Sequence, residues 1–165
     1  MAWTTPRTWV DGEIVTADIM NTHVRDNLDY LKERLDGTAT QYVRTATDYT
    51  TTSTTLTAVD GTNMALALTT DGSDVLVTFT GYASISTGTE DLTMAVLVDA
   101  TPYEIITQEL SGAANPFAVS FTYIFTGLSA AAHTFTLQWK TTGATATIHV
   151  GTTLFDVREM IGLVA

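Results

Sequence analysis

Hydrophobic and polar residues alternate over most of the chain after residue 38. In the run Val75–Thr80 one side carries apolar residues, and the same two-residue period recurs at Phe121–Phe125 and Phe135–Trp139. This is the period of a β-strand with one buried and one solvent-facing side. Short Gly- and Asp-containing turns separate about eight such segments. We therefore expect a mainly β fold, an antiparallel jelly-roll-like β-sandwich, over residues 38–165.

A different period governs residues 14–37, where apolar residues recur at intervals of three and four. Thr16 is a good N-cap for a helix, and Gly37 is a typical stop signal. Charged residues flank the narrow apolar row, which favours a short coiled coil between identical copies. An amphipathic helix packed on its own domain is the alternative. The predicted trimerisation seam consists of Ala17, Asn21, Val24, Leu28, Leu31 and Leu35.

Residues 1–13 show no hydrophobic period and are predicted to form an extended arm. They hold Trp3 and Trp9, two of the three tryptophans in the chain. Large aromatic side chains supply much buried area when they enter pockets on a partner, and Pro6 lowers the ordering cost of docking. The arm is therefore a candidate docking segment. The alternative is that both tryptophans fold back on the chain's own β-sandwich or on a neighbouring helix.

The composition excludes several classes of protein. The net charge of −11 at pH 7 disfavours binding to nucleic acid or to anionic membranes. No apolar run reaches the roughly 18 residues of a membrane span, and the start lacks the pattern of a cleaved signal peptide. The chain has no cysteine, which excludes disulfides and thiolate metal sites. Its 35 threonines are β-branched and suit the exposed faces of strands.

The sequence contains no recognisable catalytic or metal-binding motif. Its three histidines, His23, His133 and His149, stand in no nucleophile motif and no zinc-ligand spacing. Glu90 and Asp91 are adjacent, so on a strand they point to opposite faces and cannot act as a pair. We expect a protein that is not an enzyme and needs no cofactor or metal.

Two stretches carry a resemblance to known proteins. The opening WTTPRTWVDGEIVTADIMNTHVRDN resembles an N-terminal segment of tailed-bacteriophage virion proteins, over roughly residues 3–32. The stretch FTYIFTGLSAAAHTFTLQWKTTGATATI and the closing FDVREM are similar to trimeric jelly-roll knobs of phage head fibres, decoration proteins and tail fibres. The resemblance implies a homotrimeric structural protein on the particle exterior, made in the host cytoplasm. It implies attachment to the capsid or another virion protein through Trp3, Pro6, Arg7, Trp9 and Val10.

Three functions are compatible with this reading. The first is a knob that decorates and stabilises the capsid, as a head decoration or a short head fibre. The second is a receptor-binding tail-fibre tip or tail structural protein, with a host-surface glycan as partner; Trp139 with Tyr103 or Tyr123 is a candidate sugar-stacking platform. The third, a glycan-cleaving enzyme, lacks a visible carboxylate pair. About three heptads of helix make a short stalk, which favours the first function.

Overall fold

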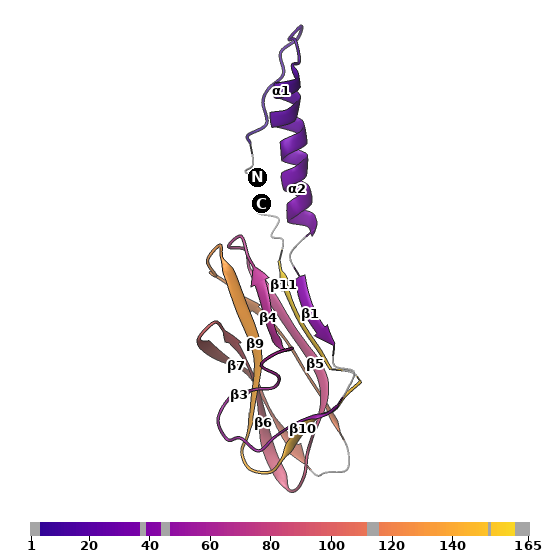
Figure 1. Cartoon of the computed structure of the whole chain (residues 1–165), viewed down its shortest axis with the longest axis vertical. Helices are drawn as coiled ribbons and strands as arrows, with labels where there is room; N and C mark the ends of the chain where they lie inside the picture. Colours follow the sequence, from indigo (N-terminus) through magenta and orange to yellow (C-terminus); the bar gives the residue numbers. More distant parts are fainter. Residues whose placement is uncertain (1–3, 37–38, 44–46, 112–115, 152, 161–165) are drawn as a thin grey trace. The chain divides into compact units, whose positions relative to one another are not determined.

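The computed structural model describes residues 4–36, 39–43, 47–111, 116–151 and 153–160, with the backbone alone for residues 33–36. The chain divides into two compact units, which we call unit 1 (Met1–Gly37) and unit 2 (Thr38–Ala165). Figure 1 shows a helix and a folded-back segment in unit 1, and two layers of strands in unit 2.

The helix of unit 1 runs from Ala17 to Asp36 in three segments: α1 (Ala17–Met20), the π-helical η1 (Asn21–Arg25) and α2 (Asp26–Asp36). The predicted N-cap is confirmed, because Thr16 Oγ1 accepts a hydrogen bond from the Ile19 N–H at 3.3 Å. Within the helix, the Asp26 N–H donates to the Asn21 carbonyl five residues earlier, which defines the π turn.

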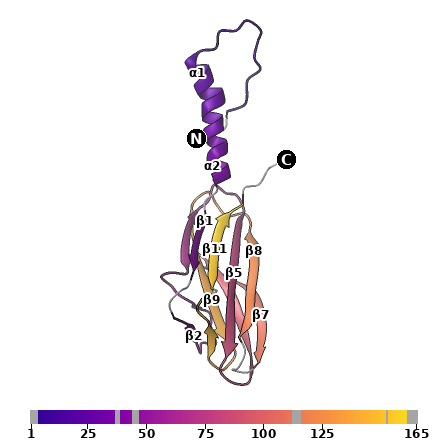
Figure 2. The ribbon, with the colours of Figure 1, turned by 90° about the vertical axis from the view of Figure 1, so that its right-hand side faces the viewer.

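The arm that precedes this helix reverses direction in a tight turn. The Glu13 N–H donates to the Val10 carbonyl at 3.1 Å, and Gly12 adopts a φ of 77°, which is easy only for glycine. Figures 1 and 2 both show the segment before the turn running back beside the helix.

Sheet A of unit 2 contains six of the described strands. Strand β5 is long enough to pair with β11 and then β10 along one edge, while β8 pairs along its other edge. Strand β1 pairs with β11, so that Ala39 lies opposite Arg158. The strands are β1 (Ala39–Val43), β2 (Tyr49–Thr51), β5 (Val75–Ile85), β8 (Phe117–Phe125), β10 (Ala146–Ile148) and β11 (Leu154–Glu159).

Sheet B contains five of the described strands and faces sheet A across the core. Strand β9 pairs with β6 on one side and with β3 and β4 on the other, and β7 closes the sheet beside β6. All these pairings are antiparallel. The strands are β3 (Thr57–Ala58), β4 (Ala65–Thr69), β6 (Thr89–Val98), β7 (Thr101–Ser111) and β9 (Ala132–Thr141).

The predicted antiparallel β-sandwich with jelly-roll character is confirmed. Val75, Val77 and Phe79 from sheet A are buried in the core, as are Phe135 and Trp139 from sheet B. Each such large apolar side chain contributes roughly 1.5–3 kcal/mol on burial. The alternation of apolar and polar residues therefore positions the two sheets against one another.

The structure differs from the sequence-based expectation in its number of strands. The described residues contain eleven strands, of which β2, β3 and β10 have two or three residues each. The stretch from Asp91 to Leu110 looks like one segment in the sequence but forms the hairpin of β6 and β7. Its turn is made by Asp99, whose φ of 54° is tolerated better by Asp than by most residues.

Candidate functional site

The arm is fastened to the helix of its own unit by one side chain. The Asn27 carboxamide donates to the Thr4 carbonyl at 2.8 Å and accepts from the Thr4 N–H at 3.0 Å. It also donates to the His23 carbonyl at 3.3 Å. Asn27 is buried, so these bonds satisfy a polar group that would otherwise be costly to cover. The arm is therefore docked on the helix beside Asn27.

A second set of contacts holds the turn of the arm. The Arg7 guanidinium forms an ion pair with the Glu13 carboxylate and lies over the ring of Trp9, with 5.4 Å between the guanidinium carbon and the ring centroid. The Val10 N–H contacts the same carboxylate at 3.5 Å. Arg7 and Glu13 thus join the two sides of the turn, and Arg7 restricts the position of the Trp9 ring.

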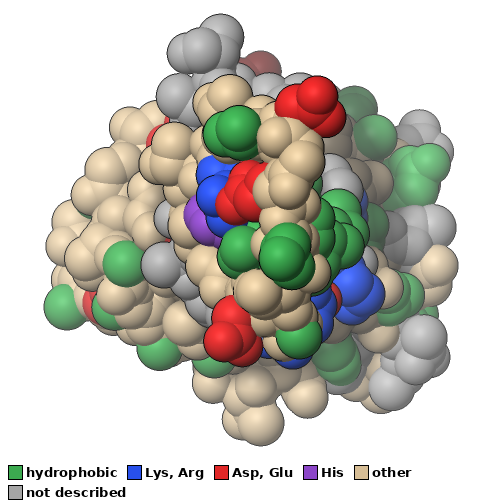
Figure 3. Space-filling view, turned by 90° about the horizontal axis from the view of Figure 1, so that it is seen from above, with side chains coloured by type: hydrophobic (Ala, Val, Ile, Leu, Met, Phe, Trp, Pro, Cys, Tyr) green, Lys and Arg blue, Asp and Glu red, His purple; other side chains and the backbone are tan. Residues whose placement is uncertain are grey.

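The predicted attachment residues lie on the surface of unit 1, apart from Arg7, which is half-buried. Trp9 is 46% exposed and Val10 67% exposed, and Ile14 and Val15 continue the apolar surface beyond the turn. Pro6 is also exposed, whereas Trp3 lies outside the described residues. Figure 3 shows hydrophobic side chains gathered beside acidic and basic ones on this surface.

The predicted trimerisation seam follows one side of the same helix. Leu28 is 59% exposed and Leu31 44% exposed, Ala17 is exposed, and Asn21 and Val24 are half-buried. The side chain of Leu35 lies outside the description. The arm contacts the neighbouring side through Asn27, so it leaves the apolar row at Leu28 and Leu31 uncovered.

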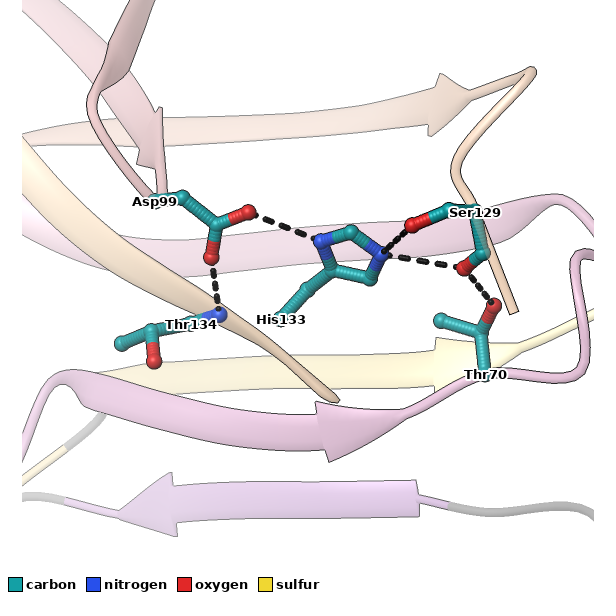
Figure 4. Close-up of polar contacts among 5 residues, drawn as sticks. All are labelled: Thr70, Asp99, Ser129, His133 and Thr134. Atoms are coloured by element: carbon teal, nitrogen blue, oxygen red, sulfur yellow. Dashed lines mark hydrogen bonds and ion pairs between the residues drawn. The ribbon is translucent and has the colours of Figure 1, made fainter. Parts of the chain in front are cut away.

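Unit 2 brings Asp99, Ser129 and His133 together at one end of β9, as Figure 4 shows. His133 Nδ1 lies 2.8 Å from Asp99 Oδ2, and Nε2 lies 3.0 Å from the Ser129 carbonyl and 3.3 Å from its hydroxyl. Asp99 Oδ1 accepts from the Thr134 N–H at 2.9 Å. The Ser129 carbonyl also accepts from the Thr70 hydroxyl at 3.2 Å.

These contacts favour the charged form of His133. A carboxylate and a carbonyl are acceptors only, so both ring nitrogens must donate. The hydrogen bonds to Asp99 and Ser129 accordingly raise the pKa of His133, although burial opposes the shift. The bond to His133 also lowers the pKa of Asp99. An imidazolium whose Nε2 donates to a carbonyl cannot take a proton from Ser129, so this cluster fastens the strand end and does not activate a nucleophile.

A second Ser–His–Asp set lies beside β10. His149 Nε2 is 2.8 Å from Ser84 Oγ, and Nδ1 is 3.1 Å from Asp48 Oδ2. Asp48 also accepts from the Val150 N–H at 2.8 Å, and this bond is the main reason that the pKa of Asp48 is lowered. The order of groups is that of a nucleophilic triad. Ser84, however, retains only 8% exposure, and a nucleophile needs room for a reacting atom beside it.

Sequence reasoning did not find either set of partners. His133 is 34 residues from Asp99, and His149 is 65 residues from Ser84 and 101 from Asp48. Strand pairing brings these residues together, and local motifs do not record it. The available signal was two histidines at strand ends in a chain with many acidic residues, which does not identify their partners.

The candidate sugar-stacking platform is only partly formed. Trp139 is buried in the core, so its ring is not available to a ligand. Tyr103 and Tyr123 are exposed and each packs against Phe125, with ring centroids 5.1 Å and 4.8 Å apart. Two exposed tyrosines therefore flank a buried phenylalanine where β7 and β8 meet.

Within the described residues, no three acidic or histidine side chains are grouped as metal ligands. In the same part of the chain, no helix is both long enough and apolar enough to cross a membrane.

Comparison with known proteins identifies a shared fold. No family model matches the chain, and no curated protein matches its sequence. A structure of infectious bursal disease virus, Gt strain, aligns over 76% of this chain and 38% of its own, with 9% identity and a TM-score of 0.50. The Eiger TNF from S. frugiperda aligns over 75% of this chain and 92% of its own, with 10% identity and a TM-score of 0.49. At these identities the likeness defines the class of fold, a jelly-roll-like β-sandwich.

Proposed function

We propose that this chain is a non-enzymatic structural protein of a tailed-bacteriophage particle. It forms a homotrimer, attaches to the capsid or another virion protein through unit 1, and decorates and stabilises the outside of the particle as a head decoration or short head fibre. The observation that carries the proposal is the apolar surface of unit 1, where Trp9, Val10, Leu28 and Leu31 are exposed in a single copy.

The fold supports a structural role. The chain shares its β-sandwich with the infectious bursal disease virus structure, so the same architecture occurs in a virus particle. The opening motif resembles phage virion proteins, and its residues Arg7, Glu13 and Asn27 have defined contacts in unit 1. The described Ser–His–Asp sets give no open catalytic site, which agrees with a protein that acts by packing.

Unit 1 separates two apolar surfaces that need different partners. Leu28 and Leu31 lie in a helical row with the spacing of a coiled-coil seam, and copies of the same helix would cover them. Trp9 and Val10 lie at the turn of the arm, and a virion protein would cover them. Three linked copies would each present such a turn, so modest individual contacts would combine into firm attachment.

Point variants at the turn test attachment. Trp9→Ala with Val10→Ala removes apolar surface that is exposed in the free chain, whereas deleting the arm would also uncover Asn27. We expect the variant to melt within about 1 °C of the wild-type protein, because exposed substitutions change stability little. It should bind poorly to particles that lack the protein, and those particles should rupture at a lower temperature. Thr8→Ala, an exposed change in the same arm, is the matched control.

A receptor-binding tail-fibre tip is the second candidate, favoured by the exposed pair Tyr103 and Tyr123. Aromatic faces bind sugar rings by stacking, as in other amphipathic recognition sites. If particles without the protein are equally heat-resistant but cannot adsorb to cells, and Tyr103→Ala reproduces that loss, the receptor function replaces decoration.

A further inference from the structure

The two sheets of unit 2 present outer faces of very different character. On sheet A, the strands β1, β11, β5 and β8 lie side by side, and Figure 2 shows them in this order. Residues directly opposite one another in neighbouring strands share a face. Leu76 thus lies between Ile124 and Arg158, and Leu154 lies between Thr80 and Val43.

The outer face of sheet A leaves large apolar side chains uncovered. Val43 is 48% exposed, and Tyr82 and Ile124 are each 44% exposed, with the half-buried Leu76 and Leu154 among them. The remaining outward positions of β5 and β8 are small or hydroxyl-bearing, such as Thr78 and Thr122, whose hydroxyls lie 3.4 Å apart. A solvated face would instead be expected to carry charge.

Charge on this face is limited to one internally neutralised pair. Among the outward residues of β1, β5, β8 and β11, only Asp156 and Arg158 are charged. Arg158 donates to Asp156 Oδ2 through Nε at 2.7 Å and through Nη2 at 2.6 Å, and Asp156 is almost fully buried. The face therefore has no net charge.

The outer face of sheet B is acidic by comparison. Asp91 lies opposite Glu109, while Glu104 forms an ion pair with Lys140. Three acids and one lysine give the outward positions of β6, β7 and β9 a net charge of −2. Its side chains are otherwise mostly Thr, Gln and Ala, such as Thr136 and Gln138.

From this contrast we propose that the outer face of sheet A is the surface through which unit 2 meets further copies of the same chain. The proposal rests on the homotrimer of the proposed function and names where its second set of contacts lies. A copy carries a net charge of −11, so copies repel one another wherever acidic faces approach within about 10 Å, the range of screened charges. The neutral face of sheet A is where an identical acidic chain can approach, and its apolar side chains gain from burial.

The first test places a charge on this face in the full chain. Ile124→Lys with Tyr82→Lys puts like charges of neighbouring copies against one another, which costs several kcal/mol when they are juxtaposed. We expect the mass by light scattering to fall from three times 17.7 kDa toward 17.7 kDa, with the dissociation midpoint raised by about tenfold or more. Ala67→Lys, on the exposed outer side of β4 in sheet B, is the matched control and should leave the trimer intact.

A footprint decides the matter even if the charged variant misfolds. The chain has no cysteine, so Thr80→Cys on the outer face of sheet A and Ala67→Cys on sheet B each add one thiol at a position exposed in a single copy. In the trimer a bulky maleimide should label Thr80→Cys about tenfold more slowly than Ala67→Cys, and dilution to monomer should remove the difference.

The outcomes separate the two proposals. If the wild-type protein is a trimer and both thiols label equally, the outer face of sheet A is free and this inference is wrong, while the proposed function stands. If the wild-type protein is a monomer at all concentrations, the homotrimer itself is wrong. Leu28→Lys in the helix identifies a trimer that is held by the helical seam alone, because only that variant would then dissociate.

Discussion

Asn27 binds Thr4, 23 residues earlier in the chain, through both the donor and the acceptor of its carboxamide, at 2.8 Å and 3.0 Å. A side chain thereby replaces the peptide group of a neighbouring strand, and the extended arm gains a defined position without becoming part of a sheet. The arm of a single copy is therefore already ordered at this point, which lowers the entropy lost when its exposed apolar residues bind a partner.

Replacing this residue should release the arm. Asn27→Ala leaves the Thr4 N–H and carbonyl without their partner, at a cost of about 1–3 kcal/mol to the local fold. We expect trypsin to cleave after Arg7 at a rate raised by roughly five- to 150-fold, the same free energy expressed as a ratio. Thr22→Ala, an exposed change in the same helix, should leave the cleavage rate unchanged. Equal cleavage in all three proteins would show that Asn27 does not hold the arm.

The Asp99–His133 pair should make stability depend on pH in a defined window. The raised pKa of His133 means that its contribution is complete below the unfolded value of about 6.5 and is lost as the pH rises through the folded pKa. The lowered pKa of Asp99 means that its contribution is present above about 3.8 and is lost as the pH falls through the folded pKa.

Urea unfolding between pH 5 and pH 9 would measure this effect. We expect the free energy of unfolding to decline above about pH 6.5, and His133→Gln to remove the part of the decline that the pair causes. Ser129→Ala keeps the Asp99 contact and should retain most of the dependence. An unchanged pH profile in His133→Gln would mean that the pair does not titrate as the geometry requires.

Asp60 should be among the polar residues whose loss is costly. Its carboxylate accepts from the Thr62 N–H and the Asn63 N–H, both at 2.9 Å, and from the Tyr49 hydroxyl. Burial would raise the pKa of Asp60, but the hydrogen bonds from Tyr49 and Asn63 outweigh it and hold that pKa far below its usual value. Asp60→Ala should lower the free energy of unfolding by about 1–3 kcal/mol, and Tyr49→Phe by about 0.5–1.5 kcal/mol.

A double-mutant cycle would test whether the two residues act together. If the Asp60→Ala and Tyr49→Phe effects simply add in the double variant, the hydroxyl–carboxylate contact contributes nothing by itself.

Ser84 should be structural in spite of its triad-like neighbours. Because it retains only 8% exposure, we expect no adduct by intact-mass measurement after treatment with a fluorophosphonate, which labels activated serines. Ser84→Ala should still cost about 0.5–1.5 kcal/mol through the lost bond to His149. A fluorophosphonate adduct on Ser84 that disappears in His149→Ala would instead reveal a nucleophilic site.

The sequence predicts the parts of this fold that depend on local periodicity. Alternation in Val75–Phe79 identifies the core side of β5, and Thr16 identifies the helix start, because each depends on neighbours within a few residues. The turn at Asp99 was missed because it contains neither Gly nor Pro and depends on a φ of 54°. The shortest strands were missed because two or three residues cannot establish a period.

The polar clusters could not be predicted for a different reason. The partners of His133 and His149 come from other strands, and the pairing that joins them is set by the whole sandwich. Trp9 could be identified as a notable aromatic from sequence, but its contact with Arg7 and the Arg7–Glu13 pair require knowledge of the turn between them. The contrast between the two sheet faces likewise appears only when register places residues opposite one another.

The pairing of Ala39 with Arg158 has a practical consequence for engineering. The chain enters and leaves the described part of unit 2 at the same end of sheet A, near Val75, because Glu159 lies opposite Val75. The turn after Ile85 lies at the other end of β5, and its residues Thr87 and Gly88 are exposed. Exposed turns of small residues tolerate insertion well. A foreign epitope inserted between Thr87 and Gly88 would thus be displayed at the end of the sandwich remote from both chain connections, which makes this turn the natural site for a vaccine antigen or an affinity tag.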